Sequence, residues 1–241
     1  MDLLADLLAD DPATPRLTVY QEDTGARLDF SALTLDNWAA KVGNMLCEEF
    51  EAEPGETSIE LRLPVGWQAV VIALGAVTAG IDFTLCPVDS PVNGDIVFCR
   101  LAEADTVADL AKESGAELVV LSDDPFGRGV TEIGKELPTP EAIDFGPTVR
   151  FYGDQFLQPV PPLKELVDTY RATTAPPPGA QHPTYCAGKR YLSPGWHSTA
   201  DFWHQVFAPL AAQASIVVVS GLVSTERLND IAQREKVDIR L

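Results

Sequence analysis

The stretch TSIELRLPVGWQAVVIALGAVTAGIDFTLCPV, residues 57–88, decides the fold class of this 241-residue chain. Its first seven residues alternate, with Glu60 and Arg62 on the outward face, as expected of a strand with one buried face. A mostly apolar helix is predicted over 66–80 and a short buried strand over 83–88. A strand, a helix and a strand of these lengths predict a βαβ unit within a largely parallel sheet.

Upstream of this unit the sequence predicts a short helix, a hairpin and an amphipathic helix. Leucines at positions 3, 4, 7 and 8 have helical spacing, and strands over 18–20 and 27–30 flank a turn at Thr24-Gly25. One apolar stripe runs along the segment 35–50, with Thr34 as its expected N-cap. A turn at Pro54-Gly55-Glu56 then leads into the βαβ unit.

Downstream, strands and helices continue to alternate. Strands are predicted over 96–99 and 117–122, with a helix over 105–115 between them. The segment 123–162 is rich in Gly, Pro and charge, and predicts loops around one or two strands such as 148–152. After it we expect, in order, a helix over 163–172, a strand over 190–192, a helix over 199–212, a strand over 215–219, a helix over 225–236 with Ser224 as N-cap, and a strand over 238–241.

These elements predict an α/β protein whose mostly parallel sheet is covered by helices. We expect one truncated domain over 1–241, with lobes 14–172 and 185–241 joined by a Pro-rich linker, 175–183. The four cysteines are widely separated and form no C-x-x-C pair, which predicts neither a disulfide framework nor a zinc site.

The formal net charge of -19 excludes one class of partner. Residues 1–145 carry 28 acidic and 8 basic side chains, whereas residues 146–241 carry 8 and 9. An acidic surface repels phosphate backbones, so nucleic acid is not an expected partner. The acidic half is either a solvated face or an interface for a basic protein.

Two observations predict a cytoplasmic protein that does not span a membrane. The longest apolar run, 69–81, is shorter than the ~20 residues that a membrane helix needs. The N-terminus has no basic segment before its leucines, which are interrupted by aspartates, so no secretory signal is predicted.

The common catalytic and phosphate-binding motifs are incomplete or absent in this sequence. Gly188-Lys189 lacks the upstream glycine and the following Ser or Thr of a phosphate-binding P-loop, which favours a turn entering a strand. Neither G-x-G-x-x-G nor G-x-S-x-G occurs in the chain. Asp123-Asp124 has no further ligand cluster nearby in sequence, and His197 and His204 are too far apart for an i, i+4 metal pair. No metal site and no catalytic residue are predicted.

Several segments together resemble the N-terminal portion of the adenylate-forming superfamily, the AMP-binding acyl-CoA synthetases and ligases. The matching segments, in chain order, are LDFSALTLDNWAAKVGNML, EPGE, TSIELRLP, GWQAVVIALGAVTAGI, AKESGAELVVLSD, and KRYLSPGWHSTADFWHQVFAPLAAQASIVVVSGLVSTERLNDIAQREKVD. The resemblance covers about two-thirds of the chain and is strongest to a short actinobacterial hypothetical-protein form that lacks the ATP motifs. It implies the fold of the N-terminal part of acyl-CoA synthetases.

The departures from that family concern the handling of ATP. Where the family has a phosphate loop rich in Ser, Thr and Gly, this chain has ATTAPPPGAQHPTYCAGK, and its three consecutive prolines remove three N–H donors that would hold phosphate. The sequence up to Leu241 contains no adenine-binding Tyr-Gly-x-Thr-Glu segment, ribose-binding aspartate or C-terminal catalytic lysine. One family position persists: Pro194-Gly195-Trp196-His197 is similar to the family's P-x-x-H segment beside the acyl pocket.

The resemblance and its departures lead to three hypotheses. The first is a non-catalytic relative that binds a small ligand or a protein, with Trp196 and His197 as the candidate ligand site and no cofactor. The second is an enzyme that keeps residual ATP, AMP or coenzyme A handling, as an AMP-forming ligase. The third is an interaction protein that uses its acidic half. An apolar surface left open by the short form favours a homo-oligomer.

Overall fold

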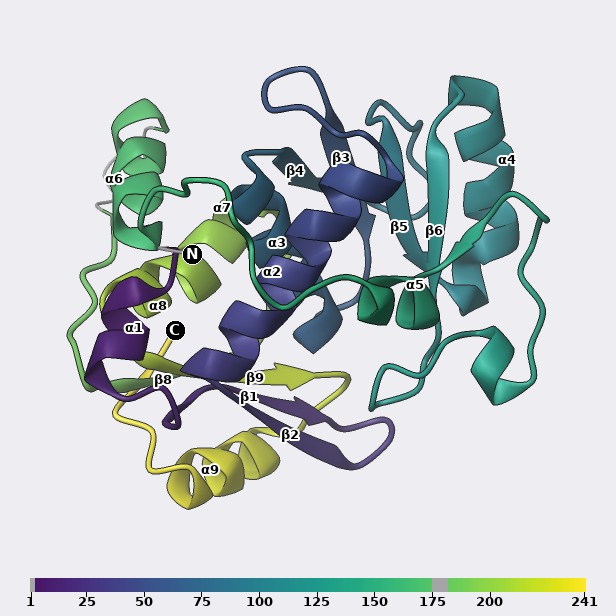
Figure 1. Ribbon diagram of the computed structural model, residues 1–241. Helices are drawn as coiled ribbons and strands as arrows, with labels where there is room; N and C mark the ends of the chain where they lie inside the picture. The colour runs from purple at the N-terminus through teal and green to yellow at the C-terminus, as the bar shows by residue number, and fades with distance from the viewer. Residues whose placement is uncertain (1–2, 175–181) are drawn as a thin grey trace. The chain divides into compact units, whose positions relative to one another are not determined.

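A computed structural model describes residues 3–174 and 182–241, which divide into two compact units (Figure 1). The first unit comprises residues up to Asp36, Val65–Trp67 and Leu157–Leu241, and the second comprises Asn37–Pro64 and Gln68–Phe156. The predicted linker 175–183 lies outside the described residues, apart from His182 and Pro183. No helix in the described ranges is long and apolar enough to cross a membrane.

The first unit is built on a five-stranded sheet of order β10-β8-β9-β1-β2, in which only the β1–β2 hairpin is antiparallel. The described elements of this unit are α1 Ala5–Asp10, β1 Pro15–Gln21, β2 Ala26–Ser31, α6 Leu163–Thr173, β8 Arg190–Ser193, α7 Thr199–Phe202, the π turn η3 Trp203–Phe207, α8 Ala208–Ala211, β9 Ser215–Ser220, α9 Thr225–Arg234 and β10 Ile239–Arg240. Helix α9 packs on the sheet through Ile231 and Ala232, against Val217 and Val219 of β9.

The second unit is built on an all-parallel sheet of order β4-β3-β5-β6-β7. Its described elements are β3 Ser58–Arg62, α3 Trp67–Ala79, β4 Asp82–Leu85, β5 Ile96–Arg100, η1 Leu101–Glu103, α4 Ala104–Ser114, β6 Glu117–Leu121, η2 Thr131–Ile133, β7 Ile143–Asp144 and α5 Phe145–Phe151. Helix α2, Ala32–Glu49, begins in the first unit and continues into the second. The predicted α/β class is confirmed, with two sheets in place of one.

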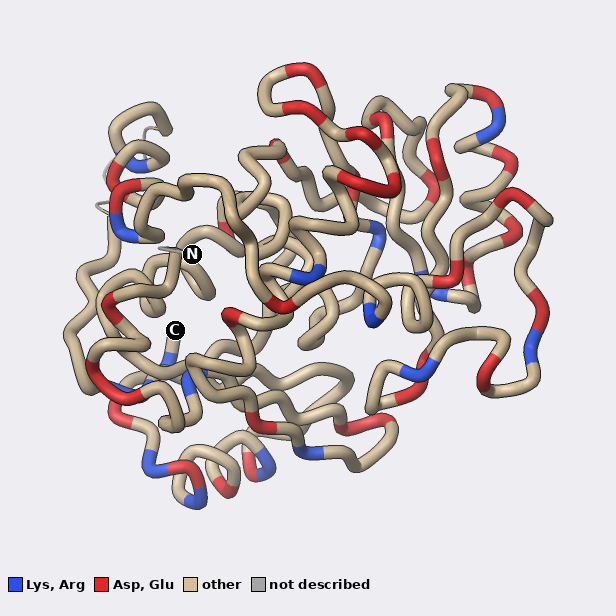
Figure 2. Tube along the Cα trace, viewed as in Figure 1, with Lys and Arg blue, Asp and Glu red and all other residues tan. Residues whose placement is uncertain are grey.

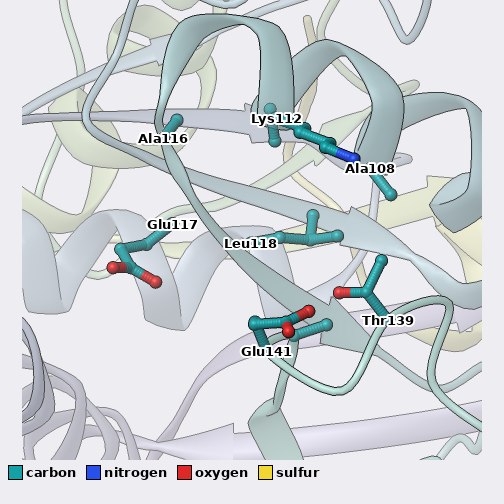
Figure 3. A pocket seen from close by; sticks show the side chains of 9 residues that line it. Ala108, Lys112, Ala116, Glu117, Leu118, Thr139 and Glu141 are labelled. Carbon is teal, nitrogen blue, oxygen red and sulfur yellow. The ribbon is translucent and has the colours of Figure 1, made fainter.

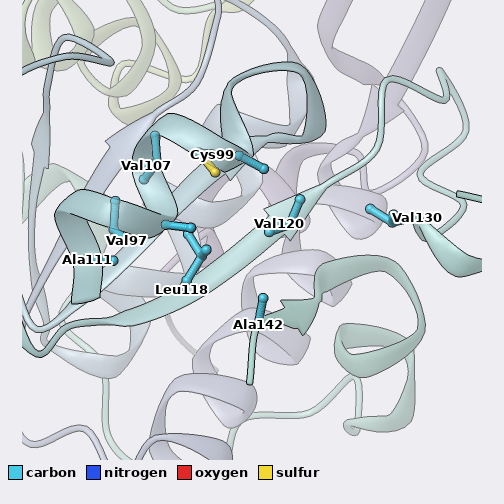
Figure 4. Close-up of a cluster of buried hydrophobic side chains, with 10 residues drawn as sticks. Val97, Cys99, Val107, Ala111, Leu118, Val120, Val130 and Ala142 are labelled. Atoms are coloured by element: carbon cyan, nitrogen blue, oxygen red, sulfur yellow. The ribbon is translucent and has the colours of Figure 1, made fainter. Parts of the chain in front are cut away.

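A small apolar core lies between α4 and the parallel sheet (Figure 4). Val107 and Ala111 of α4 face Val97 and Leu118 of the strands, and all four are buried. The helix ends where Gly115 takes φ +80°, a left-handed conformation that glycine adopts without steric cost. The helix begins and ends one residue earlier than the predicted range 105–115.

The predicted strand over 148–152 is wrong, because these residues belong mostly to helix α5. Its buried side chains, Phe145 and Val149, are four residues apart, which is helical spacing rather than alternation. Pro147 lies in the first turn, where the missing N–H costs no hydrogen bond. The β-branched and aromatic residues of this segment favour a strand locally, and burial of one helical face overrides that preference.

The expected outward positions of Glu60 and Arg62 are also wrong, since both side chains are buried, at 3% and 1% exposure. Strand β3 lies inside the parallel sheet, and such strands are covered on both faces. The two charges compensate each other across 2.7 Å, and Arg62 also donates to the carbonyls of Val88, Ser90 and Pro91. Glu60 accepts from the backbone N–H groups of Asn93 and Gly94.

Thr34 is not the N-cap of α2, because the helix begins two residues earlier, at Ala32. Ser31 Oγ accepts from the Thr34 N–H at 3.1 Å, which makes Ser31 the cap. The predicted cap of α9 is confirmed, since Ser224 Oγ accepts from the Arg227 N–H at 3.1 Å.

Candidate ligand-binding site

A rigid turn follows strand β8 and positions Trp196. Ser193 Oγ donates to Gln205 Oε1 at 2.6 Å and accepts from the Gly195 N–H at 3.1 Å. Gly195 has φ +107°, and a Cβ at this position would lie 2.7 Å from Val65 Cγ2. Only glycine fits both the backbone conformation and the close approach, so the turn holds Trp196 in one place.

Trp196 points into the first unit, where 4% of the residue is exposed. Its ring meets Phe202 edge to face, with centroids 4.8 Å apart. The indole Nε1 is buried and has no hydrogen-bond acceptor among the described residues. An unpaired buried donor of this kind costs about 1–3 kcal/mol.

His197 lies in a different environment from its neighbour. Its side chain is exposed, and its backbone N–H donates to Asp201 Oδ2 at 3.2 Å. Helix α7 begins directly after it, with Ser198 Oγ accepting from the Asp201 N–H. The two predicted ligand residues therefore stand on opposite sides of the chain, one buried and one facing solvent. Their joint role as a ligand site stays a prediction.

The lysine of the turn before β8 is engaged in an ion pair. Lys189 Nζ donates to Asp238 Oδ1 at 2.8 Å, and Asp238 Oδ2 accepts from the Arg190 N–H. Gly188, with φ +72°, lies in the turn that leads into β8. Gly188-Lys189 thus lies in a turn that enters a strand, as the sequence predicts, and the Lys189 amine is paired with Asp238.

A cavity of about 330 Å³ opens in the second unit between α4, β6 and the loop before β7 (Figure 3). Its walls are small and apolar, formed by Ala108, Ala111, Ala116, Leu118 and Ala142. Its polar lining residues are Lys112, Glu117, Thr139 and Glu141. The three charged residues are exposed, so they line the open side of the cavity rather than its floor.

The structure brings together two histidines whose proximity no sequence motif indicates. His204, in the π turn η3, lies with its ring centroid 5.1 Å from that of His182, 22 residues earlier in the chain. Burial, with His182 and Arg171 beside it, lowers the pKa of His204. Tyr170 stacks on Trp203 at 4.5 Å and meets His204 edge to face.

Comparison with known proteins finds one relative in sequence and several solved structures with the same fold. No protein-family model matches the chain. A TIGR03089 family protein of Mycobacterium tuberculosis is 38% identical over 226 residues, which cover 90% of this chain and 88% of that protein.

Solved structures of acyl-CoA synthetases share the fold over nearly the whole chain. An acyl-CoA synthetase of Brucella canis aligns over 99% of this chain with a TM-score of 0.68 and 16% identity. The acetoacetyl-CoA synthetase of Streptomyces lividans aligns over 98%, with the same TM-score and identity. The chain spans 52% and 41% of the lengths of these two enzymes.

Proposed function

This chain belongs to the TIGR03089 family and has the fold of the N-terminal part of acyl-CoA synthetases, and on this basis we propose that it is a non-catalytic relative that binds a small organic ligand. The observation that carries the proposal is the buried indole N–H of Trp196, which has no acceptor within residues 3–174 and 182–241 and lies just past the carboxyl end of β8. Ligands of open α/β sheets bind beyond the carboxyl ends of the strands.

The chemistry of the segment 172–189 supports the proposed absence of catalysis. Adenylation requires donors that stabilise charge on a transferring phosphate. Three prolines stand in the corresponding stretch, and the nearby lysine is bound to Asp238. We therefore propose that neither ATP nor AMP is a cofactor of this protein.

The ligand that fits Trp196 has an apolar body and an acceptor oxygen. The ring is surrounded by Phe202 and the apolar core of the first unit, so the body of the ligand is acyl or aryl. A carbonyl or carboxylate oxygen would accept from Nε1. Acyl-CoA thioesters and free carboxylic acids both carry these groups.

The test is a thermal-shift screen with ATP, AMP, coenzyme A, a panel of acyl-CoAs and the corresponding free acids. A ligand at 100 times its Kd adds about 2.7 kcal/mol to stability, which raises the melting temperature visibly. We expect shifts with acyl compounds and none with ATP or AMP. Trp196→Phe keeps the aromatic contact with Phe202 and removes the N–H, so it should weaken the shift several-fold. His197→Gln tests the predicted share of the neighbouring imidazole in this site and should also weaken the shift.

Three outcomes would change the conclusion. Formation of AMP from ATP and a carboxylic acid would overturn the non-catalytic reading. A ligand shift that Trp196→Phe leaves intact would move the site to the alanine-lined cavity around Leu118. No shift with any compound would favour a protein partner.

A specific observation supports a protein partner as the second candidate. The second unit carries 21 acidic and seven basic residues, and Figure 2 shows the acidic positions spread over its helices and loops. A basic surface on a partner would complement this charge.

A further inference from the structure

The hydrogen bonding of His182 determines which of its ring nitrogens carries the proton. Nε2 lies 3.1 Å from the carbonyl oxygen of Thr174, which can only accept. Nε2 therefore holds the hydrogen and donates it. In the neutral ring, Nδ1 is then left with a lone pair. That nitrogen is buried and has no hydrogen-bond partner among the described residues.

The ring of His204 lies beside the ring of His182. The two ring centroids are 5.1 Å apart and the rings are tilted by 38°. In the described part of the chain, no hydrogen bond engages either ring nitrogen of His204, and its backbone carbonyl accepts from the hydroxyl of Tyr185 at 2.6 Å. His204 lies in a π turn, a rare irregularity that is frequent at functional sites.

The spacing of the rings matches two imidazoles that share one ion. Protein Zn–N bonds are about 2.1 Å long, and each nitrogen lies about 1.1 Å from its ring centroid. At a tetrahedral angle of about 109°, the two centroids are then about 5 Å apart. The separation of 5.1 Å agrees with this value. The backbone carbonyl that holds the other nitrogen of His182 is the usual outer partner of a metal-bound histidine.

We propose that His182 and His204 form a two-imidazole site for a late first-row divalent ion such as Zn²⁺, Ni²⁺ or Cu²⁺. Imidazole is a preferred ligand of these ions and a poor one for Mg²⁺ or Ca²⁺. Among residues 3–174 and 182–241, no group of three His, Cys, Asp or Glu side chains is placed to hold a metal. The pair therefore supplies two ligands and leaves the remaining positions open.

The charges around the pair indicate what would fill those positions. Arg171 and Asp201 both act electrostatically on His204, with opposite signs. Arg171 donates to the Pro183 carbonyl at 2.9 Å, and its buried Nε has no partner among the described residues. The positive charge of Arg171 repels a divalent ion that has no other ligands. It favours an ion that also binds an anion, such as chloride or a carboxylate. This site does not depend on the ligand proposed for Trp196.

The test is a calorimetric titration of the untagged protein with ZnCl₂, NiCl₂ or CuCl₂ in excess MgCl₂, which occupies the many surface carboxylates. We expect one ion per chain, with Cu²⁺ bound most tightly. His182→Gln and His204→Gln should each weaken binding at least tenfold. The third histidine supplies the matched control, and His197→Gln should bind as the wild type does.

A second measurement needs no variant. Zn²⁺ added to the wild-type protein should shift the imidazole proton resonances of two of the three histidines and leave the third in place. Binding that vanishes in excess Mg²⁺, or that His197→Gln weakens as much as the other two variants, would overturn the proposal. So would a titration in which no histidine resonance moves. Failure of the acyl-ligand screen would leave these results unaffected.

Discussion

At the scale of single residues, Glu235 carries the most heavily shared charge of the first unit. Its carboxylate accepts from Tyr20 and Arg27, and from Arg190 at 2.7 Å, which ties α9 to three strands. Burial alone would raise the pKa of Glu235, but the hydrogen bonds from Arg27, Tyr20 and Arg190 lower it to about 2.

This lowered pKa predicts a loss of stability in acid. The contribution of Glu235 is complete above its unfolded pKa, near 4.5, and disappears as the pH falls through about 2. Glu235→Gln should cost roughly 1–3 kcal/mol at pH 7 and progressively less below pH 4.5. Urea unfolding at several pH values measures this. Glu226→Gln, on the exposed first turn of the same helix, is the control, and an equal loss in that variant would contradict the assignment.

The buried pair Glu60–Arg62 gives a second prediction at this scale. Arg62→Met removes the positive charge and leaves the carboxylate of Glu60 buried without its partner. It should therefore destabilise the second unit by about 3–5 kcal/mol. A double variant, Glu60→Met with Arg62→Met, leaves no buried charge and should recover part of that loss. Unfolding free energies of the three proteins decide the point. A double variant no more stable than Arg62→Met alone would show that the carbonyl contacts of Arg62 matter more than its charge.

At the scale of elements, helices α2 and α3 cross where Gly75 meets Val42. A Cβ at Gly75 would lie 2.3 Å from Val42 Cβ, closer than any real contact. The crossing therefore requires glycine for a steric reason. The backbone conformation does not require it, since Gly75 has no positive φ. The glycine lowers helix propensity in α3 so that the two helices can approach.

Gly75→Ala should destabilise the protein by about 1–3 kcal/mol through this clash, despite the higher helix propensity of alanine. Val42→Ala in the same chain makes room for the new methyl group, so the double variant should be more stable than Gly75→Ala alone. Thermal unfolding of the three variants closes the cycle. Strictly additive losses would indicate that the helices do not clash at this point.

At the scale of the whole molecule, the net charge of -19 sets the response to salt. Repulsion among the 21 acidic residues of the second unit opposes folding, and salt screens it within about 10 Å at 0.1 M. The free energy of unfolding should rise by about 1 kcal/mol between 20 and 200 mM NaCl. Urea titrations at each salt concentration measure it, with sucrose at matched osmolality as control. A fall with salt would mean that surface ion pairs outweigh the repulsion.

Much of the local structure is predictable because its causes are local. The helix over 66–80, the cap at Ser224 and the left-handed glycine at 115 each depend on neighbours within a few residues. Local causes do not predict the segment 145–151. Its β-branched and aromatic residues favour a strand, and burial of one face makes it a helix. The resemblance to the front of acyl-CoA synthetases agrees with the structural comparison.

The candidate site was only half visible in the sequence. The motif Pro194-Gly195-Trp196-His197 singles out a turn after a strand, and the turn is there. Its consequence, a buried indole N–H beside an exposed histidine, depends on Phe202 and Val65, which no local pattern connects to it.

The sequence by itself determined the order and type of most elements, the acidic surface and the family of the fold, since periodicity, capping and composition act over short distances. Only the tertiary structure decided that β1 pairs with β9, about 200 residues away, and that Glu60 and Arg62 compensate each other inside a sheet. It also brought His182 beside His204. These contacts arise from packing the whole chain, where burial on both faces and long-range pairing outweigh the preference of any single segment.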